Sequence, residues 1–352
     1  MISKKDNGKS KLNKALRLTA KILIPLTIGV FILWLLYRNM DVDALLETLQ
    51  SDADFGILVL AAFFGTVGNT FRGMRWQILN KSLSPNARAI NSILTTHGNY
   101  TLNMALPRLG EVWRCAAMAH YSRMSFSSLF GTLIIDRAYD IVVMLLLLLL
   151  GMFLNLGFFS DFFRENPGFI ESLQRIFSSP WFYVALILVI IGVIFFVKSL
   201  GRGKFGQKIK EQLDNVWNGL KTVVSMDRKW LFYLYTIGIW AGYFLQFYLA
   251  FFAFSFTAHL SPAIALIAFL MGAIAIAAPV QGGMGAWHFM VIYTLVFFGI
   301  ETGDAQNFAL IVHTSQQFIW NPLIGLICIG LLPLINKKYK KEELDIDHER
   351  ED

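Results

Sequence analysis

Charged side chains are scarce in this sequence. Only 16% of its 352 residues are Asp, Glu, Lys or Arg, whereas 55% are hydrophobic, and soluble domains average about 25% charged residues. A chain of this composition has too little polar surface to hide its apolar side chains in one water-covered core. We therefore expect lipid to be the solvent for most of it, which excludes an ordinary soluble domain.

Cysteine and metal-binding patterns are also lacking. Cys115 and Cys328 lie far apart in the chain, which gives neither a disulfide framework nor a zinc pattern, and we interpret both as small buried hydrophobic residues. His97, His288 and His313 have no metal-ligand spacing, so each is expected to be a satisfied polar residue in a helix bundle. No nucleotide-binding loop and no Ser-His-Asp or Cys-His set stands out. We expect no metal, no cofactor and no nucleic-acid partner.

Long apolar runs are what the sequence does contain. A spanning helix needs about 20 mostly apolar residues, and such runs lie at roughly 20–37, 55–76, 126–156, 180–198, 230–256 and 305–335. We therefore expect an all-α transmembrane helix bundle of about six full spans, with residues 20–335 as the transmembrane domain. No small-residue cleavage site follows the first run, so we expect it to stay in place as a transmembrane helix.

Lys and Arg are distributed unevenly among the connecting segments. They gather in the N-terminal residues 1–19, in 72–123, in 198–229 and in the charged tail 336–352, whereas acids prevail in 38–54, 157–179 and 301–304. Because cytoplasmic loops carry the excess of basic residues, both termini should lie in the cytoplasm. Residues 198–229 also show amphipathic helical spacing, which suits either the inner leaflet or a solvated helix packed on its own protein.

Two regions fit neither a span nor a loop. Residues 91–107 are uncharged but rich in Asn, Ser and Thr, and residues 261–300 contain no Asp, Glu, Lys or Arg and are interrupted by APVQGGMGAWH. In the predicted topology each region starts and ends on one side, so each should enter the membrane and return. Irregular backbone at that depth needs protein or a water-filled cavity around it. Two broken, re-entrant hairpins entering from opposite faces also suggest an inverted repeat, as in transporters.

The stretch NMALPRLGEVWRC closes the first of these regions with charge. Pro107 should stop or kink the segment, Gly110 permits a tight turn or helix start, and Glu111 suits a helix N-terminus. Arg108 comes just before this helix, and Arg114 shares a helix face with Glu111. Because an arginine fork matches a phosphate, the cluster could bind a lipid head group, with Glu111 orienting an arginine. It could equally be a structural ion pair whose arginines extend toward water.

A second charged cluster, LIIDRAYD, lies just inside the run 126–156 and contains Asp136, Arg137 and Asp140. Asp136 and Asp140 are four residues apart and share a helix face. An ionisable residue at depth costs on the order of 2.5–3.5 kcal/mol, so pairing or water must offset that cost. The cluster is either a buried structural network or the lining of a polar cavity. Its candidate partners are Arg108, Arg114 and the pair Arg72 and Arg75 in FRGMRW.

The third motif is the interruption of 261–300, with Pro279, Gly282, Gly283 and Gly285. Glycine permits positive φ and close backbone approach. The amides at the start of the following helix could receive an anionic group. The alternative is a plain tight turn between two helices.

These motifs together resemble the flippase-like integral membrane family, which includes the transmembrane region of bacterial lysylphosphatidylglycerol synthases. The resemblance covers about residues 20–335 and rests on PRxGExxR, on DR in the following span and on the glycine motif. The matching positions are Asn103, Pro107, Arg108, Gly110, Glu111, Arg114, Asp136, Arg137, Pro279, Gly282, Gly283 and Gly285. The resemblance implies a lipid-translocating domain in a bacterial inner (plasma) membrane. The synthases also carry a soluble C-terminal domain that this sequence does not show, so synthase activity is not expected and the lipid stays open.

We therefore expect a flippase-like protein whose head-group cavity lies between the two hairpins. Arg108 and Arg114 would contact the phosphate, while Glu111 and Asp136 hold those arginines or receive an amino group. The expected substrate-binding residues are Arg72, Arg75, Asn103, Arg108, Glu111, Arg114, Asp136, Arg137 and Asp140.

Two other functions are open at this point. One is a membrane enzyme acting on a lipid-linked substrate, with Glu111 or Asp136 as general acid or base. The other is a non-catalytic partner of a lipid-modifying enzyme. The expected partner is a membrane lipid. A second copy of the chain and a lipid-modifying enzyme are further candidate partners.

Overall fold

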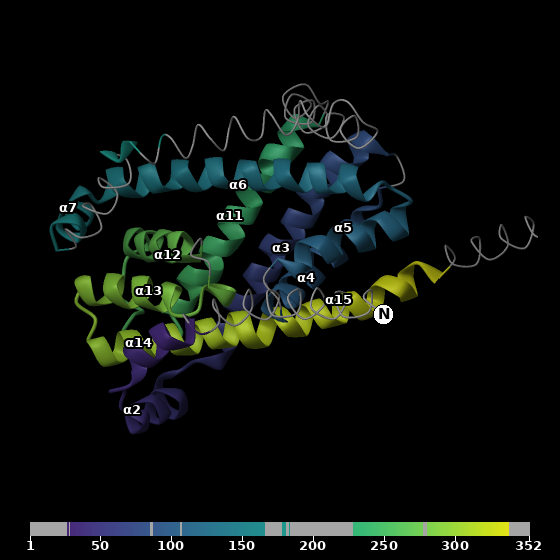
Figure 1. Ribbon diagram of the computed structural model, residues 1–352. Coiled ribbons are helices and arrows are strands. Elements are labelled where there is room, and N and C mark those ends of the chain that lie inside the picture. Colours follow the sequence, from purple (N-terminus) through teal and green to yellow (C-terminus); the bar gives the residue numbers. More distant parts are fainter. Residues whose placement is uncertain are drawn as a thin grey trace, which may run out of the picture. The chain divides into compact units, whose positions relative to one another are not determined.

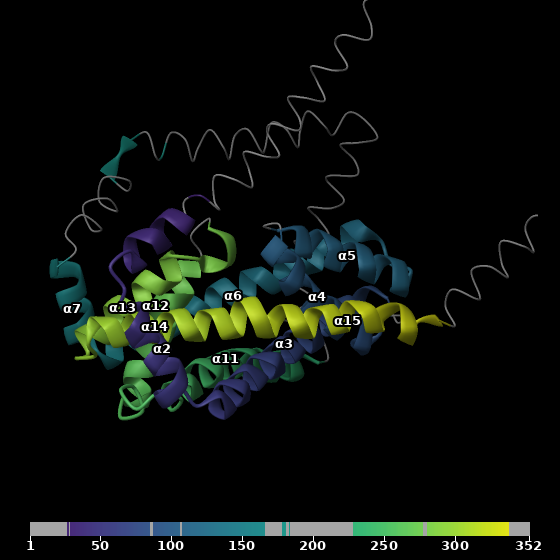
Figure 2. The same ribbon diagram turned by 90° about the horizontal axis from the view of Figure 1, so that it is seen from below.

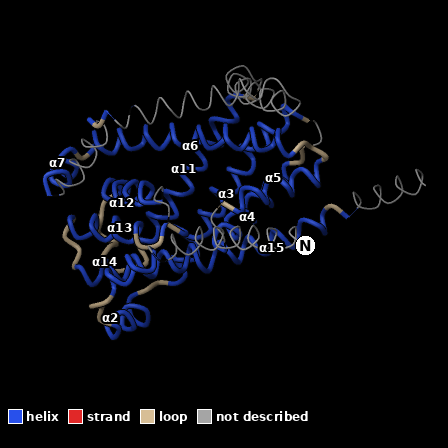
Figure 3. The backbone as a smooth tube through the Cα atoms, viewed as in Figure 1, coloured by secondary structure: helices blue, strands red, loops and turns tan. Residues whose placement is uncertain are grey.

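In the computed structural model of the chain, all regular structure among the described residues is helical, and no strand occurs in this part (Figure 3). The predicted all-α class is thereby confirmed. The described residues are Thr27, 29–84, 87–105, 108–165, 178–180, Tyr183, 228–276 and 280–337. The expectations for 1–19, for most of 180–198 and 198–229, for the tail after Lys337, and for Pro107 and Pro279 lie outside them.

Three helical stretches are long and apolar enough to cross a membrane: α3 (Phe55–Leu83), α11 (Lys229–Phe251) and the continuous run Thr302–Ile335. A fourth candidate is α6 (Phe126–Leu154), which bends by 99° into α7 (Leu156–Glu165). All four lie where the apolar runs predict them. The full set of six spans is not confirmed by the described residues.

The chain folds as two compact units. The first comprises Met1–Met124 and Trp230–Asp352, and the second comprises Ser125–Lys229. Within the described residues the second unit contains α6 and α7. The first contains α2 (Val42–Glu47), η1 (Thr48–Asp52), α3, α4 (Ala89–Ala105), α5 (Leu109–Ser122), α11, α12 (Pro262–Ile276), η2 (Gln281–Gly283), α13 (Ala286–Phe297), α14 (Thr302–His313), η3 (Thr314–Trp320) and α15 (Asn321–Ile335).

The helices α4 and α5 form an antiparallel hairpin. Gly110 at the start of α5 packs on the Asn99 carbonyl, and farther along the Trp113 ring packs on Gly98. Although α4 is polar, its hydroxyls are satisfied either within the helix or by neighbouring helices. Thr96 Oγ1, for example, donates to the Ser92 carbonyl at 2.6 Å. The helix can therefore be buried in protein, as its composition requires.

The same polar helix packs antiparallel against α15. Asn91 and Asn336 exchange side-chain amide hydrogen bonds of 3.2 and 2.9 Å at one end of the pair. At the other end Thr101 Oγ1 donates to the Asn321 carbonyl at 3.2 Å. Between them, Gly325 leaves no room for a side chain against α4. Small residues at such contacts let membrane helices approach closely.

The helices α12 and α13 form the second hairpin. The Trp287 indole of α13 packs on Gly272 of α12, and the connection runs through η2. Its glycines Gly282, Gly283 and Gly285 have φ values of 61°, 75° and 76°, the positive φ that glycine permits. Because an L side chain is strained there, glycine is the residue that such a turn requires.

The two hairpins meet beside one long helical run. Residues Thr302–Ile335 form 34 helical residues, about 51 Å at 1.5 Å per residue. α13 packs against its first part, α14, and α4 packs against its last part, α15 (Figures 1 and 2). Where the hairpins end, a Cβ at Gly282 would lie 3.4 Å from the Met104 sulfur. The hairpins thus approach from opposite ends of this run.

Candidate functional site

Arg114 is the most deeply placed charge of the α4–α5 hairpin. Its side chain has 0% exposure, and its guanidinium lies 4.0 Å from the centre of the Trp76 ring on α3. A desolvated cation over an indole is stabilised by about 2 kcal/mol. An Arg114 that extends toward water, the alternative left open by the sequence, is therefore wrong.

Arg72 and Arg75 of α3 are buried as well, at 6% and 0% exposure. Arg72 lies over the Tyr243 ring of α11 at 5.5 Å, and Arg75 lies over Phe232 at the same distance. Arg75 Nη1 also donates to Thr236 Oγ1 at 3.3 Å. The three arginines that are buried among the described residues of this unit thus each lie over an aromatic ring, a contact that the charge pattern of the sequence does not show. We call Arg72, Arg75 and Arg114 the arginine cluster.

A hydroxyl and amide network adjoins this cluster. Tyr243 Oη donates to Asn69 Oδ1 at 2.6 Å, and the Tyr100 hydroxyl lies 3.2 Å from that of Tyr243. Sequence reasoning missed Asn69, Tyr100 and Tyr243 as members of the site. For Asn69 a signal was present, because it lies three residues before Arg72 and so shares its helix face.

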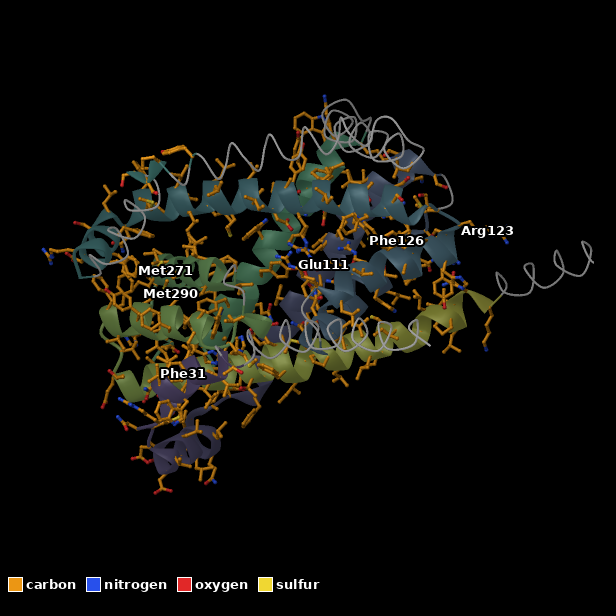
Figure 4. The ribbon with its side chains drawn as sticks, in the orientation of Figure 1. Phe31, Glu111, Arg123, Phe126, Met271 and Met290 are labelled. Carbon is orange, nitrogen blue, oxygen red and sulfur yellow. The ribbon has the colours of Figure 1, made fainter. Side chains whose placement is uncertain are left out.

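The start of α5 confirms part of the sequence reasoning. Glu111 lies in the first turn of α5, as predicted, and is half-buried (Figure 4). Asn103 Oδ1 accepts the Gly110 N–H at 2.8 Å, which satisfies one of the amide groups left open at a helix N-terminus. Asn103, predicted to bind substrate, therefore holds the corner of the hairpin. A direct role in binding stays a prediction.

Arg108 is the N-cap of α5 and differs sharply from Arg114. Its backbone is left-handed, with φ of 65°, and its side chain is exposed. Arg123, at the other end of α5, is also left-handed, with φ of 48°, and exposed. Left-handed backbone is uncommon for a residue other than glycine. The predicted cluster at the membrane edge is thus split between an exposed Arg108 and a buried Arg114.

The second charged motif lies on α6 in the other unit. Asp136 is fully buried and Asp140 is 9% exposed, while Arg137 Nη1 lies 3.8 Å from Asp140 Oδ2. Both carboxylates are therefore sheltered, as expected for residues that share a helix face. Their pairing with Arg72, Arg75, Arg108 or Arg114 stays a prediction from the sequence.

The glycine turn contacts two histidines. His313 Nε2 lies 3.0 Å from the Gly282 carbonyl, and the Gly285 N–H donates to His288 Nδ1 at 3.4 Å. Both ends of the turn are therefore bonded to side chains of the same unit. The reception of an anion by the amides of α13 stays a prediction.

An open crevice of about 330 Å³ adjoins the second hairpin on the side of residues 29–37. Its lining is apolar, so it suits a lipid acyl chain rather than a polar head group. The lining side chains are those of Ile32, Ile274, Ala275, Ala286, Phe289 and Met290, the last of which is labelled in Figure 4.

Metal chemistry has no candidate site among the described residues. No group of three or more His, Cys, Asp or Glu side chains there could hold a metal ion. Cys115 and Cys328 are free thiols and both are buried. Their interpretation as small buried residues is therefore confirmed.

Comparison with known families identifies the family of this chain. The family model for the lysylphosphatidylglycerol synthase TM region matches residues 22–322. The chain belongs to this family. Comparison with curated proteins and with solved structures finds no match. Family membership, together with the apolar helices, makes the chain an integral membrane protein. A membrane-lipid context fits this family.

Proposed function

We propose that this chain moves a phospholipid, or another lipid with an anionic head group, between the two leaflets. The observation that carries the proposal is the arginine cluster: three guanidinium groups buried to 6% exposure or less inside a protein of this membrane family. Permanent charge at such depth is expensive and usually marks an ion or substrate pathway.

The chemistry of the cluster suits a phosphate. A guanidinium presents several N–H donors in a rigid fork, which matches two phosphate oxygens at once. The aromatic rings of Trp76, Phe232 and Tyr243 limit the positions that each guanidinium can take. Such preorganisation favours recognition of one head-group geometry. The acyl chains would stay in lipid, where the apolar crevice beside Met290 could hold part of one.

The hairpins supply the path in this proposal. We place the α4–α5 hairpin on the cytoplasmic side and the α12–α13 hairpin on the outer side of a bacterial inner membrane, with both termini cytoplasmic. Their meeting point at Gly282 and Met104 then lies at depth. A head group could pass where the two hairpins separate, as in transporters built from opposed broken helices. Because the sequence has no nucleotide-binding loop, transport would run downhill or on a gradient.

Purified protein in liposomes tests the proposal. Fluorescent phospholipids are placed in both leaflets, and dithionite destroys the fluorescence of the outer leaflet. We expect loss of inner-leaflet fluorescence as well. Arg114→Lys keeps the charge but removes the planar fork, so it should slow this loss at least about tenfold.

The matched control is Arg123→Lys on the same helix, since Arg123 is exposed and outside the cluster. It should transport like the unaltered protein. Equal elution profiles in detergent exclude misfolding as the cause of a loss. Transport by Arg114→Lys at the unaltered rate would refute the head-group role of the cluster. A search over several lipid head groups without any inner-leaflet loss would refute transport itself.

A further inference from the structure

His288 and His313 form a buried pair in the middle of the first unit. Their exposures are 2% and 3%, and their ring centres lie 4.5 Å apart. The Trp287 ring lies 4.9 Å from that of His313. Each histidine is bonded to the glycine turn that ends the α12–α13 hairpin. None of these contacts belongs to the arginine cluster.

The hydrogen bonds assign the protons of both rings. The Gly282 carbonyl can only accept, so His313 Nε2 must carry a hydrogen. His288 Nδ1 accepts the Gly285 N–H and is therefore bare. A neutral His313 then has a bare Nδ1, and this atom is buried without a hydrogen-bond partner. A buried unsatisfied nitrogen in a native structure needs an explanation.

The surroundings contain few other groups that can change charge. Tyr37 faces the edge of the His288 ring at 5.8 Å, and Phe318 faces His313. The elements α4, α12, α13, η3 and α15 contain no Asp, Glu, Lys or Arg. Among the other neighbours, α14 has Asp304 in its first turn, α11 has Lys229 at its start, and α3, which packs against η3, carries Arg72 and Arg75 of the arginine cluster. Arg38, next to Tyr37, lies over Trp34.

We propose that His313 Nδ1 is a proton-binding site that controls the glycine turn at the end of the α12–α13 hairpin. A proton from water bonds to the bare Nδ1 lone pair, and the imidazole becomes an imidazolium. His288 stays neutral, because a second positive charge 4.5 Å away would be repelled. The Trp287 ring offsets part of the cost of the buried charge.

Protonation acts on the hairpin through one hydrogen bond. The bond from His313 Nε2 to the Gly282 carbonyl becomes charge-assisted, and such bonds are roughly twice as strong as neutral ones. Gly282 also meets Met104 at the end of the other hairpin. A stronger bond therefore fixes the glycine turn more firmly to α14, at the point where the turn lies beside Met104. Coupling to lipid movement rests on the proposed function: protonated protein should translocate lipid about fivefold more slowly.

The proton site itself is tested without transport. The chain has 6 histidines, so nitrogen-15 NMR of histidine-labelled protein in lipid nanodiscs can resolve them. His313→Gln assigns the signal by its loss and keeps a donor for Gly282. We expect the Nδ1 signal of His313 to change from a bare to a protonated nitrogen as the pH is lowered from about 8 to about 3, a range that extends well into acid because burial disfavours the charged imidazolium. A signal that stays bare over this range overturns the proposal.

Transport measured over the same pH range tests the coupling. The unaltered protein should slow toward acid pH, His313→Gln should be indifferent to pH, and His259→Gln, a change at an exposed histidine, should keep the slowing. Transport that is indifferent to pH although His313 titrates overturns the coupling. A titrating His313 in a protein that moves no lipid supports the proton site and refutes the proposed function instead.

Discussion

The two hairpins of the first unit share a topology but are built from opposite kinds of side chain. Buried polar residues fill α4, among them Asn91, Thr95 and Asn99 at 0% exposure. The α12–α13 hairpin is largely apolar, with one histidine, the glutamine of its turn and two hydroxyls as its main polar groups, and Ala265, Ala268 and Leu270 are among its buried residues. The first hairpin therefore depends on satisfied hydrogen bonds, and the second depends on close apolar packing.

The turns of the two hairpins also differ in the residues that take positive φ. Gly282, Gly283 and Gly285 take the positive φ values of the second hairpin, whereas Arg108 takes the left-handed position of the first. A glycine there would be less strained. Strained backbone is enriched at functional sites, which makes Arg108 a candidate for a functional role in the first hairpin, whereas glycine avoids this strain in the second.

The largest expected effect is that of Gly110→Ala. A Cβ at Gly110 would run into the Asn99 carbonyl, which cannot move without disrupting α4. We expect a loss of about 3 kcal/mol or more of stability, seen as early thermal unfolding in detergent. Gly330→Ala in α15 is the control, because nothing lies within 4 Å of its Cβ position. If both variants unfold at the same temperature, α4 and α5 do not approach this closely at Gly110.

A smaller effect is expected for Gly272→Ala in the second hairpin. Here the obstacle is Nε1 of Trp287 at 2.7 Å, an atom of a side chain rather than of the backbone. The indole can shift, so the loss should be about 1–2 kcal/mol. Thermal unfolding of Gly303→Ala, where no atom lies within 4 Å, provides the reference. If Gly272→Ala loses as much stability as Gly110→Ala, the predicted difference between a backbone obstacle in the first hairpin and a side-chain obstacle in the second is wrong.

The smallest effect, and the most informative, is that of Arg108→Gly. Removal of left-handed strain should raise stability by about 0.5–1 kcal/mol after the added freedom of the unfolded chain is counted. Lipid transport should nevertheless fall, since Arg108 is predicted to contact the phosphate. Arg123→Gly relieves the same strain at the other end of α5 and should leave transport intact. Transport that survives both changes would assign Arg108 to the turn alone.

Much of the fold could be predicted from residue patterns. Apolar runs located α3, α6, α11 and the α14–α15 run, because a membrane requires about 20 apolar residues wherever it is crossed. The start of α5 followed from local chemistry around Glu111, and the glycines of the second hairpin marked where positive φ is permitted. These features depend on neighbours in the chain, which a sequence displays directly.

The contacts that build the site could not be predicted in the same way. Trp76 holds Arg114, Tyr243 holds Arg72, and Asn336 pairs with Asn91 across 245 positions of the chain. Such partners depend on which helices pack together, and the sequence displays no repeat or charge pattern that fixes this. The exposure of Arg108 and the burial of Arg114 differ for the same reason, although only six positions separate them.

The π-helical segment Thr314–Trp320 separates the two halves of the Thr302–Ile335 run. A π-helix has more residues per turn than an α-helix, so a segment of this kind rotates the faces of the helix that follows relative to those of the helix before it. The face of α15 that packs against α4 is therefore not fixed by the face of α14 that packs against α13. Because of this segment, two hairpins with different side-chain patterns can pack against the same helical run, and its backbone stays continuous.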